Sequence, residues 1–308
     1  MILKFLGSSL TMPYYFDIAN NKDLTLAPTL FDNKFLMVQN EYRQTEKNYD
    51  LLADFGYVRN YKSSSNNTKK NLAHFFSKLN YDLNYKNFLT SNLSLNVSKV
   101  NNDSYLKVFE NHITKSQVKP DDLNVLNNSI KLNLNHERFN FNTGFEIFEK
   151  LDVKKSDRFQ YILPYYDFDK IISDDFFKGT LDLNSSGYND LNNTNVLEST
   201  ITNNLNYKSK DFITNLGFKN NLNIYTKNFN SVGRNSSKYK STMQSEVINL
   251  YNTTISYPLI KINDNNSSYL LPKLSFNFNP SDMKDHSSSV KKMDAESLFN
   301  TNRLGLTD

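Results

Sequence analysis

The sequence contains no cysteine and no tryptophan, and its 308 residues include only eight glycines and seven prolines. Without cysteine, the chain forms no disulfide bond and no cysteine-ligated metal site. It has no run of about 18 or more apolar residues, so a transmembrane helix is excluded. The 36 basic and 32 acidic residues are well mixed, with no Lys/Arg block of the kind that binds nucleic acid. These absences exclude disulfide scaffolds, helical membrane proteins and nucleic-acid-binding proteins.

Aromatic residues are abundant: 23 phenylalanines and 19 tyrosines make up 14% of the chain, and 38% of all residues are hydrophobic. A disordered chain lacks this much apolar surface. The apolar residues are spread singly rather than clustered, which is typical of strands with one apolar and one polar face. The composition therefore favours an all-β protein.

Apolar and polar residues alternate along much of the chain. In residues 92–98 every second residue is apolar, and the pattern returns in residues 130–135 and 139–142, on either side of His136-Glu137-Arg138. This arrangement predicts a β-hairpin joined by a short turn. The same alternation occurs in residues 77–83, 180–184, 200–207, 216–225, 247–256 and 274–278. We expect roughly fourteen antiparallel strands of about ten residues each.

Polar stretches separate the expected strands, most clearly residues 61–71, 185–195, 228–240 and 282–292. Short turns alternating with longer polar loops are typical of an antiparallel transmembrane β-barrel of the outer membrane. A soluble β-sandwich or β-solenoid shows the same alternation, although no repeat of about 20–30 residues is present. The pattern alone leaves the membrane barrel and the soluble all-β folds open, and no boundary divides the chain into two domains.

Two adjacent pairs of tyrosines, Tyr14-Tyr15 and Tyr165-Tyr166, stand within the expected strands. Outer-membrane barrels carry belts of aromatic residues at both membrane interfaces. We interpret these tyrosines as belt residues or as side chains that pack at strand ends.

No residues form a recognisable catalytic or metal-binding motif. The four histidines, His74, His112, His136 and His286, are scattered, and none stands at metal-ligand spacing from another. Neither a Gly-x-Ser-x-Gly nucleophile motif nor a glycine-rich phosphate loop occurs. We therefore expect no enzymatic activity, no cofactor and no metal.

An ordered series of motifs occupies residues 12–43. The series consists of Pro13-Tyr14-Tyr15-Phe16, Ile18-Ala19, Asp23, Thr25, Pro28 and Glu41-Tyr42-Arg43. It resembles the start of the barrel in the LptD family of lipopolysaccharide-assembly proteins. There, a Pro-Tyr-Tyr-aromatic segment leads through a short turn into an Asp-x-Thr-x-x-Pro strand, and a further strand carries Glu-aromatic-Arg. The turn departs from the family at one position, because Asn20 stands where the family has proline.

A second resemblance lies near the end of the chain. Pro272 precedes an alternating segment that resembles a family strand leading into a long loop. The residues that follow resemble the family signature Leu-Phe-x-x-Asn-Arg-aromatic-x-Gly-x-Asp, and the matching positions are Leu298, Phe299, Asn302, Arg303 and Asp308. Leu304 replaces the aromatic residue and Gly305 falls one position early, so this match is weaker than the first.

Pro13 and Pro28 fall in the first two expected strands. Proline has no N–H and cannot donate to a β-ladder, so this pairing is expected to be under-bonded. Each unmade backbone hydrogen bond is costly within a membrane. The resemblance implies that both prolines lie beside the junction of the first and last strands, a lateral gate that opens to release lipopolysaccharide. From the residues alone, the alternative is that both prolines sit at strand ends.

The resemblance also implies a place and partners for the chain. It implies a partial barrel over residues 10–308, after a tail or linker end at residues 1–9, in the outer membrane of a Gram-negative bacterium. The chain is then expected to be a fragment holding about half of a barrel of about 26 strands. The implied partners are lipopolysaccharide, membrane lipid, an LptE-like plug lipoprotein and an LptA-like periplasmic bridge. A porin-like passive channel and a soluble all-β adhesin or carbohydrate-binding protein remain alternatives.

Overall fold

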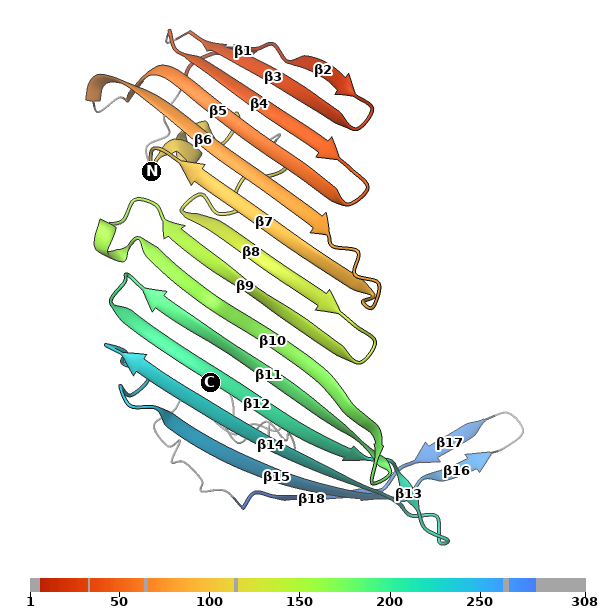
Figure 1. Cartoon of the computed structure of the whole chain (residues 1–308). Coiled ribbons are helices and arrows are strands. Elements are labelled where there is room, and N and C mark those ends of the chain that lie inside the picture. The colour runs from red at the N-terminus through yellow and green to blue at the C-terminus, as the bar shows by residue number, and fades with distance from the viewer. Residues whose placement is uncertain (1–5, 33, 64–65, 114–115, 263–265, 281–308) are drawn as a thin grey trace.

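The computed structural model describes residues 6–32, 34–63, 66–113, 116–262 and 266–280. One antiparallel sheet dominates them (Figure 1). Its strands are β1 (Ser9–Thr11), β2 (Tyr14–Ala19), β3 (Lys22–Phe31), β4 (Leu36–Thr45), β5 (Tyr49–Ser63), β6 (Asn66–Asp82), β7 (Thr90–Val100), β8 (Val125–Asn135), β9 (Phe139–Lys150), β10 (Phe159–Phe176), β11 (Gly179–Asn192), β12 (Val196–Ser209), β13 (Phe212–Ile213), β14 (Lys219–Arg234), β15 (Gln244–Ser256) and β18 (Lys273–Phe278). A separate hairpin contains β16 (Leu259–Ile262) and β17 (Ser267–Leu270), and the short helices are α1 (Tyr105–Phe109) and η1 (Lys155–Asp157).

The sheet has the form of part of a barrel wall. From β3 to β12 each strand pairs with the next one in the chain, and β14, β15 and β18 continue the order. Both β1 and β2 pair with β3, and β13 pairs with β14. The two edges of the sheet do not pair with each other within the described residues (Figure 1). The predicted all-β class with antiparallel strands is confirmed, and so is the hairpin formed by β8 and β9, in which His136 N donates to Phe139 O at 2.8 Å. In the described part of the chain, no helix is long and apolar enough to cross a membrane.

Four polar stretches were predicted to be loops, and for three of them the prediction is wrong over most of their length. Residues 61–63 and 66–71 lie in β5 and β6, residues 185–192 lie in β11, and residues 228–234 lie in β14. Strand propensity depends strongly on context, and here a neighbouring strand supplies backbone partners for Asn and Ser residues. The strands are therefore longer than expected, reaching 18 residues in β10. The fourth stretch, residues 282–292, lies outside the described residues.

The sheet has an apolar face and a polar face. Residues opposite each other in an antiparallel pair, and alternate residues along a strand, share a face. By this register the apolar face carries Leu10, Leu30, Val38, Phe55, Phe75, Leu95, Ile130, Phe145, Phe168, Leu183, Leu205, Ile224, Ile255 and Phe276. The polar face carries Thr25, Glu41, Asp54, Lys78, Asn96, Ser129, Glu146, Asp167, Ser186, Thr202, Asn252 and Ser275. Many large side chains of the apolar face are exposed, and an apolar surface of this extent calls for a lipid or protein cover.

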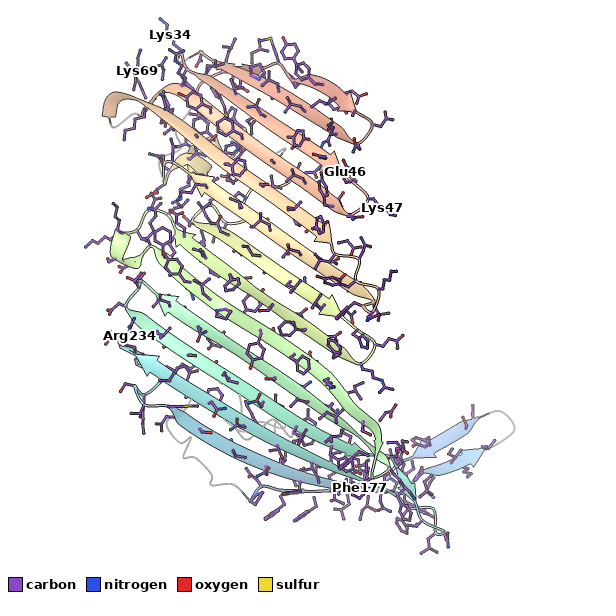
Figure 2. All side chains as sticks on the ribbon, viewed as in Figure 1. Lys34, Glu46, Lys47, Lys69, Phe177 and Arg234 are labelled. Atoms are coloured by element: carbon purple, nitrogen blue, oxygen red, sulfur yellow. The ribbon has the colours of Figure 1, made fainter. Side chains whose placement is uncertain are left out.

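Charged residues border this apolar surface. Lys34, Lys69 and Arg234 lie at one end of the sheet, while Glu46 and Lys47 lie at the other (Figure 2). Charged strand ends on either side of an apolar band are the arrangement expected for strands that cross an apolar layer.

A polar ladder interrupts the apolar face on β11, β12 and β14. Ser185 Oγ donates to the side-chain oxygen of Asn203 at 2.7 Å, and the Asn203 amide donates to that of Asn228 at 3.3 Å. The hydroxyl of Tyr166 lies 3.1 Å from Ser185 Oγ. Because these polar groups satisfy one another, the ladder lowers the cost of placing them in apolar surroundings.

A bulge in β10 shifts the phase of its alternation, so Tyr165 and Tyr166 lie on the opposite faces from those that alternation counted from residues 159–162 gives. The register shifts within residues 162–165, so Tyr165 pairs with Gly144 and Tyr188 on the polar face, while Tyr166 stays on the apolar face. Bulges insert an extra residue and thereby redirect side chains. The interpretation of Tyr165 as an aromatic-belt residue is therefore wrong.

The described residues of the connection between β7 and β8, 101–113 and 116–124, fold onto the polar face, and we call them the insert. The insert carries α1, which lies against the sheet beside β6 (Figure 1). Three side chains of α1, those of Tyr105, Leu106 and Phe109, are fully buried. They form a hydrophobic core with Phe31, Phe35, Met37, Val58, Tyr61, Leu72, Phe76, Val100, Ile113, Val118, Leu126 and Leu151. Burial of this apolar area stabilises the insert on the wall.

Three buried polar side chains meet beneath α1. His74 Nδ1 lies 2.7 Å from the Tyr105 hydroxyl, and His74 Nε2 lies 3.2 Å from Asp54 Oδ1. Burial raises the pKa of Tyr105, so its phenol keeps its proton. Because buried polar groups are costly without partners, the contact between His74 Nδ1 and the Tyr105 hydroxyl favours this position of α1 over β6.

We expect Gly56→Ala to loosen the insert. A Cβ at Gly56 would lie 2.3 Å from His74 Cε1 and 3.0 Å from the Tyr105 hydroxyl, so one of them has to move. Such overpacking destabilises a fold by about 1–3 kcal/mol. Urea unfolding and limited proteolysis within residues 101–113 measure the effect, with Ala53→Ser on the opposite face of β5 as control. Unchanged unfolding and unchanged cleavage would show that Gly56 does not set this packing.

Candidate functional site at the N-terminal edge of the sheet

The first strand of the sheet is interrupted by proline. Both β1 and β2 pair with β3, with Thr11 opposite Thr29 and Tyr14 opposite Leu26. Pro13 lies in the gap between β1 and β2. We call the pairing of β1 and β2 with β3 the seam.

The two prolines remove donors from both sides of this first strand. Met12 N donates to the Pro28 carbonyl at 3.0 Å, so the backbone of residue 28 faces the seam, yet Pro28 has no N–H to return a bond. Since successive N–H groups of a strand point to alternate sides, the donor missing at Pro13 is one that would point to the open edge. The alternative that both prolines sit at strand ends is wrong for Pro28, which lies inside β3.

The first strand separates an apolar surface from a polar one. Four of its side chains are 39–61% exposed on the apolar face, namely Leu10, Met12, Tyr14 and Phe16. Tyr15 lies on the polar face, opposite Thr25. A molecule at this edge therefore meets apolar groups on one side of the strand and polar groups on the other.

An ion-pair cluster lies on the polar face beside the seam. Arg43 Nε is 2.9 Å from Asp23 Oδ1 and 3.8 Å from Glu41 Oε1, and Thr25 is opposite Glu41 across β3 and β4. The structure thus brings together four of the motif residues predicted from the sequence. Opposite charges across strands strengthen pairing, so β3 is held more firmly by β4 than by the first strand.

The second predicted motif lies at the other edge of the sheet. Pro272 precedes β18, and its carbonyl accepts a hydrogen bond from Tyr257 N at 3.0 Å. The remaining motif positions, Phe299, Asn302, Arg303 and Asp308, lie outside the described residues.

A groove that the sequence did not predict runs along the polar face. It consists of three cavities of about 300, 730 and 630 Å³, of which the first is lined by Arg43, the second by residues 117–122 of the insert and the third by Tyr165. Lys78 lines the first two cavities and Lys131 lines the last two. We call this row of neighbouring cavities the polar groove, and it extends from β4 to β11.

The sheet opens where the insert leaves it. β7 and β8 pair along residues 90–96 and 129–135, and beyond them a side chain takes over, because Ser98 N donates to the Asn128 side-chain oxygen at 2.8 Å. At this end of β7 and β8 the insert leaves the sheet, and its residues 117–122 line part of the polar groove.

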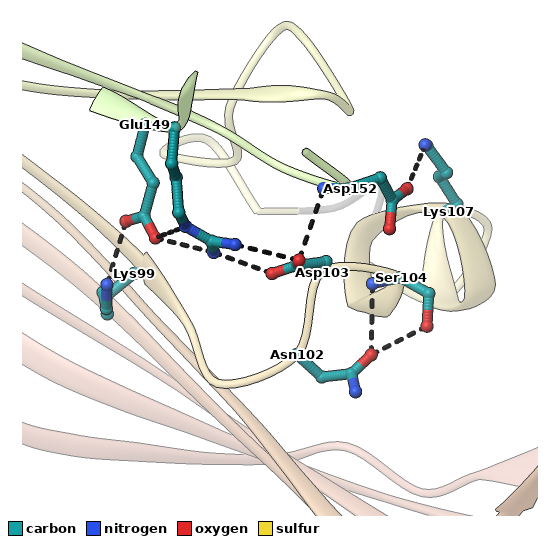
Figure 3. Close-up of polar contacts among 8 residues, drawn as sticks. Lys99, Asn102, Asp103, Ser104, Lys107, Glu149 and Asp152 are labelled. Atoms are coloured by element: carbon teal, nitrogen blue, oxygen red, sulfur yellow. Dashed lines mark hydrogen bonds and ion pairs between the residues drawn. The ribbon is translucent and has the colours of Figure 1, made fainter. Parts of the chain in front are cut away.

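Arg158 fastens the insert to the neighbouring turn through Asp103 and Glu149, both of which Figure 3 labels. Its guanidinium donates to the two carboxylate oxygens of Asp103 at 2.9 and 2.7 Å and to Glu149 at 2.8 Å. Glu149 also accepts a hydrogen bond from Lys99 at 2.9 Å. The hydrogen bonds from Arg158 lower the pKa of Asp103, and bidentate pairs of this kind are among the stronger polar contacts.

We expect Arg158→Gln to release the first part of the insert. Amide hydrogen exchange of residues 101–113 should rise at neutral pH, whereas Arg138→Gln, in a turn at the other end of the sheet, should not change it. The folded-state pKa of Asp103 is below its unfolded value, so its contact stabilises the insert above about pH 4 and weakens as the pH falls further. At low pH, amide exchange of residues 101–113 in the wild-type protein should therefore approach that in Arg158→Gln. Equal exchange at neutral pH would contradict this role for Arg158.

No group of three or more His, Asp or Glu side chains among the described residues could hold a metal ion. Of the histidines, His74 is buried under α1, while His112 and His136 contact aromatic rings. His286 lies outside the described residues.

Two curated proteins share part of the sequence, and both are named LPS-assembly protein LptD. The first, from Cupriavidus necator, is 28% identical over 115 residues, which cover 37% of this chain and 13% of that protein. The second, from Ralstonia nicotianae, is 36% identical over 61 residues, which cover 20% of this chain and 8% of that protein. The matched segments thus span a small part of these relatives. No protein-family model matches the sequence.

Among solved structures, a bacterial polysaccharide outer membrane secretin aligns with 88% of this chain and 89% of its own. The two chains are 12% identical and the TM-score is 0.30. A score of this size does not establish a shared fold.

Proposed function

We propose that this chain forms one wall of an outer-membrane β-barrel that delivers lipopolysaccharide to the outer leaflet. The observation that carries the proposal is the first strand, which is under-bonded at Pro13 and Pro28 and has an apolar surface on one side and a polar surface on the other. The partial likeness to two LPS-assembly proteins supports the same cargo.

The two faces suit an amphipathic cargo. Acyl chains would travel along the apolar side of the first strand, while the sugars would pass through the polar groove. The pairing of the first strand with β3 lacks the hydrogen bond that an N–H at residue 28 would donate. The first strand is therefore easier to displace than a fully bonded one, because fewer backbone hydrogen bonds break. In this proposal the first strand swings outward at the seam, and the open edge beside Pro13 forms one side of the lateral gate.

The proposal names partners for the chain and assigns it no catalysed reaction. Lipopolysaccharide and membrane lipid would contact the wall, an LptE-like lipoprotein would plug the barrel, and an LptA-like bridge would supply cargo from the periplasm. Transport of this kind breaks no covalent bond, so we propose that the chain is not an enzyme.

A passive porin-like channel is the second candidate, because the polar groove alone would also fit one. A passive channel, however, gives no role to Pro13 and Pro28. A soluble adhesin is disfavoured, because such a protein buries its apolar faces in a core, whereas here side chains such as Phe276, at 67% exposed, remain uncovered.

Depletion of the protein in cells separates the two candidates. If the chain delivers lipopolysaccharide, depletion lowers newly made lipopolysaccharide at the cell surface and leaves it in the inner membrane and periplasm. If the chain is a passive channel, surface lipopolysaccharide stays normal while uptake of small solutes falls. The second outcome would overturn the proposal.

A further inference from the structure

Two tyrosines stand side by side on a face built mainly of small polar and charged residues. Tyr165 and Tyr188 are direct partners across β10 and β11, and the bulge in β10 is what turns Tyr165 to this face. Gly144 makes room for the ring, since a Cβ there would lie 2.8 Å from the Tyr165 hydroxyl. Neither tyrosine belongs to the hydrophobic core beneath α1, so core packing does not explain them.

Polar groups surround this tyrosine pair. Asp167 and Asp190 line the same cavity of about 630 Å³, together with the ion-paired side chains of Lys131 and Glu146. One oxygen of Asp190 accepts a hydrogen bond from Gln160 at 2.9 Å, and the other accepts one from Asn192 at 3.0 Å. Each carboxylate oxygen keeps a further lone pair that can accept from a ligand. The cavity therefore combines two aromatic rings with charged hydrogen-bonding groups at its rim.

A second aromatic pair lies beyond the cavity. The ring centroids of Phe229, on the polar face of β14, and Tyr239, which follows β14 in the chain, are 6.2 Å apart. Aromatic side chains thus occur at two places along this part of the sheet, on β10 and β11 and at β14.

A sugar ring fits this combination of groups. The C–H groups of a pyranose carry slight positive charge, and the face of an aromatic ring is negative. Sugar hydroxyls donate to carboxylates and accept from a lysine. A nucleic acid is a poorer fit, because three of the four charged side chains that line the cavity are acidic and would repel phosphates.

We propose that Tyr165 and Tyr188 form an aromatic platform that binds sugar rings, with Asp167 and Asp190 accepting hydrogen bonds from their hydroxyls. The identity of the sugar rests on the proposed function, which makes it the glycan of lipopolysaccharide. Neighbouring cavities of the polar groove share Lys131 or Lys78 as lining residues, so a glycan that extends from the platform along the groove reaches toward Arg43.

Photo-crosslinking in cells tests the platform. A photoreactive residue replaces Ser186, which lines the cavity and is opposite Asp167, in the wild-type, Tyr165→Leu/Tyr188→Leu and Tyr251→Leu backgrounds. Tyr251 is a matched control because it lies on the apolar face. Adducts are treated with mild acid, which cleaves the glycan from its lipid anchor, to show that the protein is attached to sugar.

We expect a glycan adduct whose yield falls about tenfold in the double variant, as loss of two aromatic contacts implies, and stays unchanged in Tyr251→Leu. Two results would overturn the platform and leave the transport proposal intact. One is an equal adduct yield in all three backgrounds, and the other is no adduct at Ser186 while adducts form at Met12 beside the seam. The two proposals can also fail separately in the other direction. If the glycan adduct depends on both tyrosines, but depletion of the protein leaves surface lipopolysaccharide normal, the platform is supported and the transport proposal is overturned.

Discussion

A disulfide between Thr11→Cys and Thr29→Cys is expected to stop lipopolysaccharide delivery. The two residues are opposite each other across the seam, with hydroxyl oxygens 2.9 Å apart. Thr11 and Thr29 flank the hydrogen-bonded pair of Met12 and Pro28, so they form a non-hydrogen-bonded pair. The Cα atoms of such a pair are about 4.5 Å apart, which is within the range that a disulfide can bridge. The chain has no cysteine of its own, so no competing disulfide forms within it. The cross-link fixes the first strand to β3 and prevents the movement that we propose.

Non-reducing gels report the oxidised fraction, and labelling of surface lipopolysaccharide reports delivery. Delivery should fall in step with oxidation and return when a reductant is added. The control is Thr200→Cys/Ser231→Cys, which joins opposed residues of β12 and β14 in the interior of the sheet and should leave delivery unchanged. Normal delivery by a fully oxidised seam would rule out movement of the first strand away from β3.

Ile130→Arg is expected to prevent stable assembly in the membrane. Ile130 is 47% exposed on the apolar face and stands in the middle of β8. An arginine on the lipid face near the bilayer midplane costs roughly 2–4 kcal/mol, which is a large part of the stability of an ordinary domain. Folded protein in the outer-membrane fraction, detected by its altered mobility on unheated gels, should therefore decrease strongly.

Asn133→Arg provides the matched control. It introduces the same charge three residues along the same strand but on the polar face, opposite Asn92 and Asn142. Wild-type levels are expected for this variant. Equal tolerance of both arginines would contradict the assignment of the apolar face to lipid.

The sequence predicted the features that depend on local alternation and on known motifs. Alternation along residues 130–135 and 139–142 located the hairpin of β8 and β9, because the two-residue period reports which face each side chain takes. The motif residues Asp23 and Arg43 proved to be spatial neighbours, since their strands are adjacent in the chain as well as in the sheet.

The sequence did not predict features that depend on distant contacts. Tyr105 and Phe109 belong to a five-residue helix, too short for helical periodicity to stand out, and they are buried only because β5 and β6 offer an apolar patch and His74. The direction of Tyr165 depends on a bulge that shifts the register of β10 by an extra residue. Alternation counted without that shift places the tyrosine on the wrong face.

Photo-crosslinking at the seam tests the central claim most directly. A photoreactive residue replaces Met12, on the apolar side beside Pro13, or Ala27, on the polar side beside Pro28. We expect lipopolysaccharide adducts at both positions, attached through the lipid at Met12 and through the glycan at Ala27, and both lost when upstream transport is blocked. Protein that reaches the outer membrane but forms no adduct at either position would contradict the lateral gate and favour a passive channel.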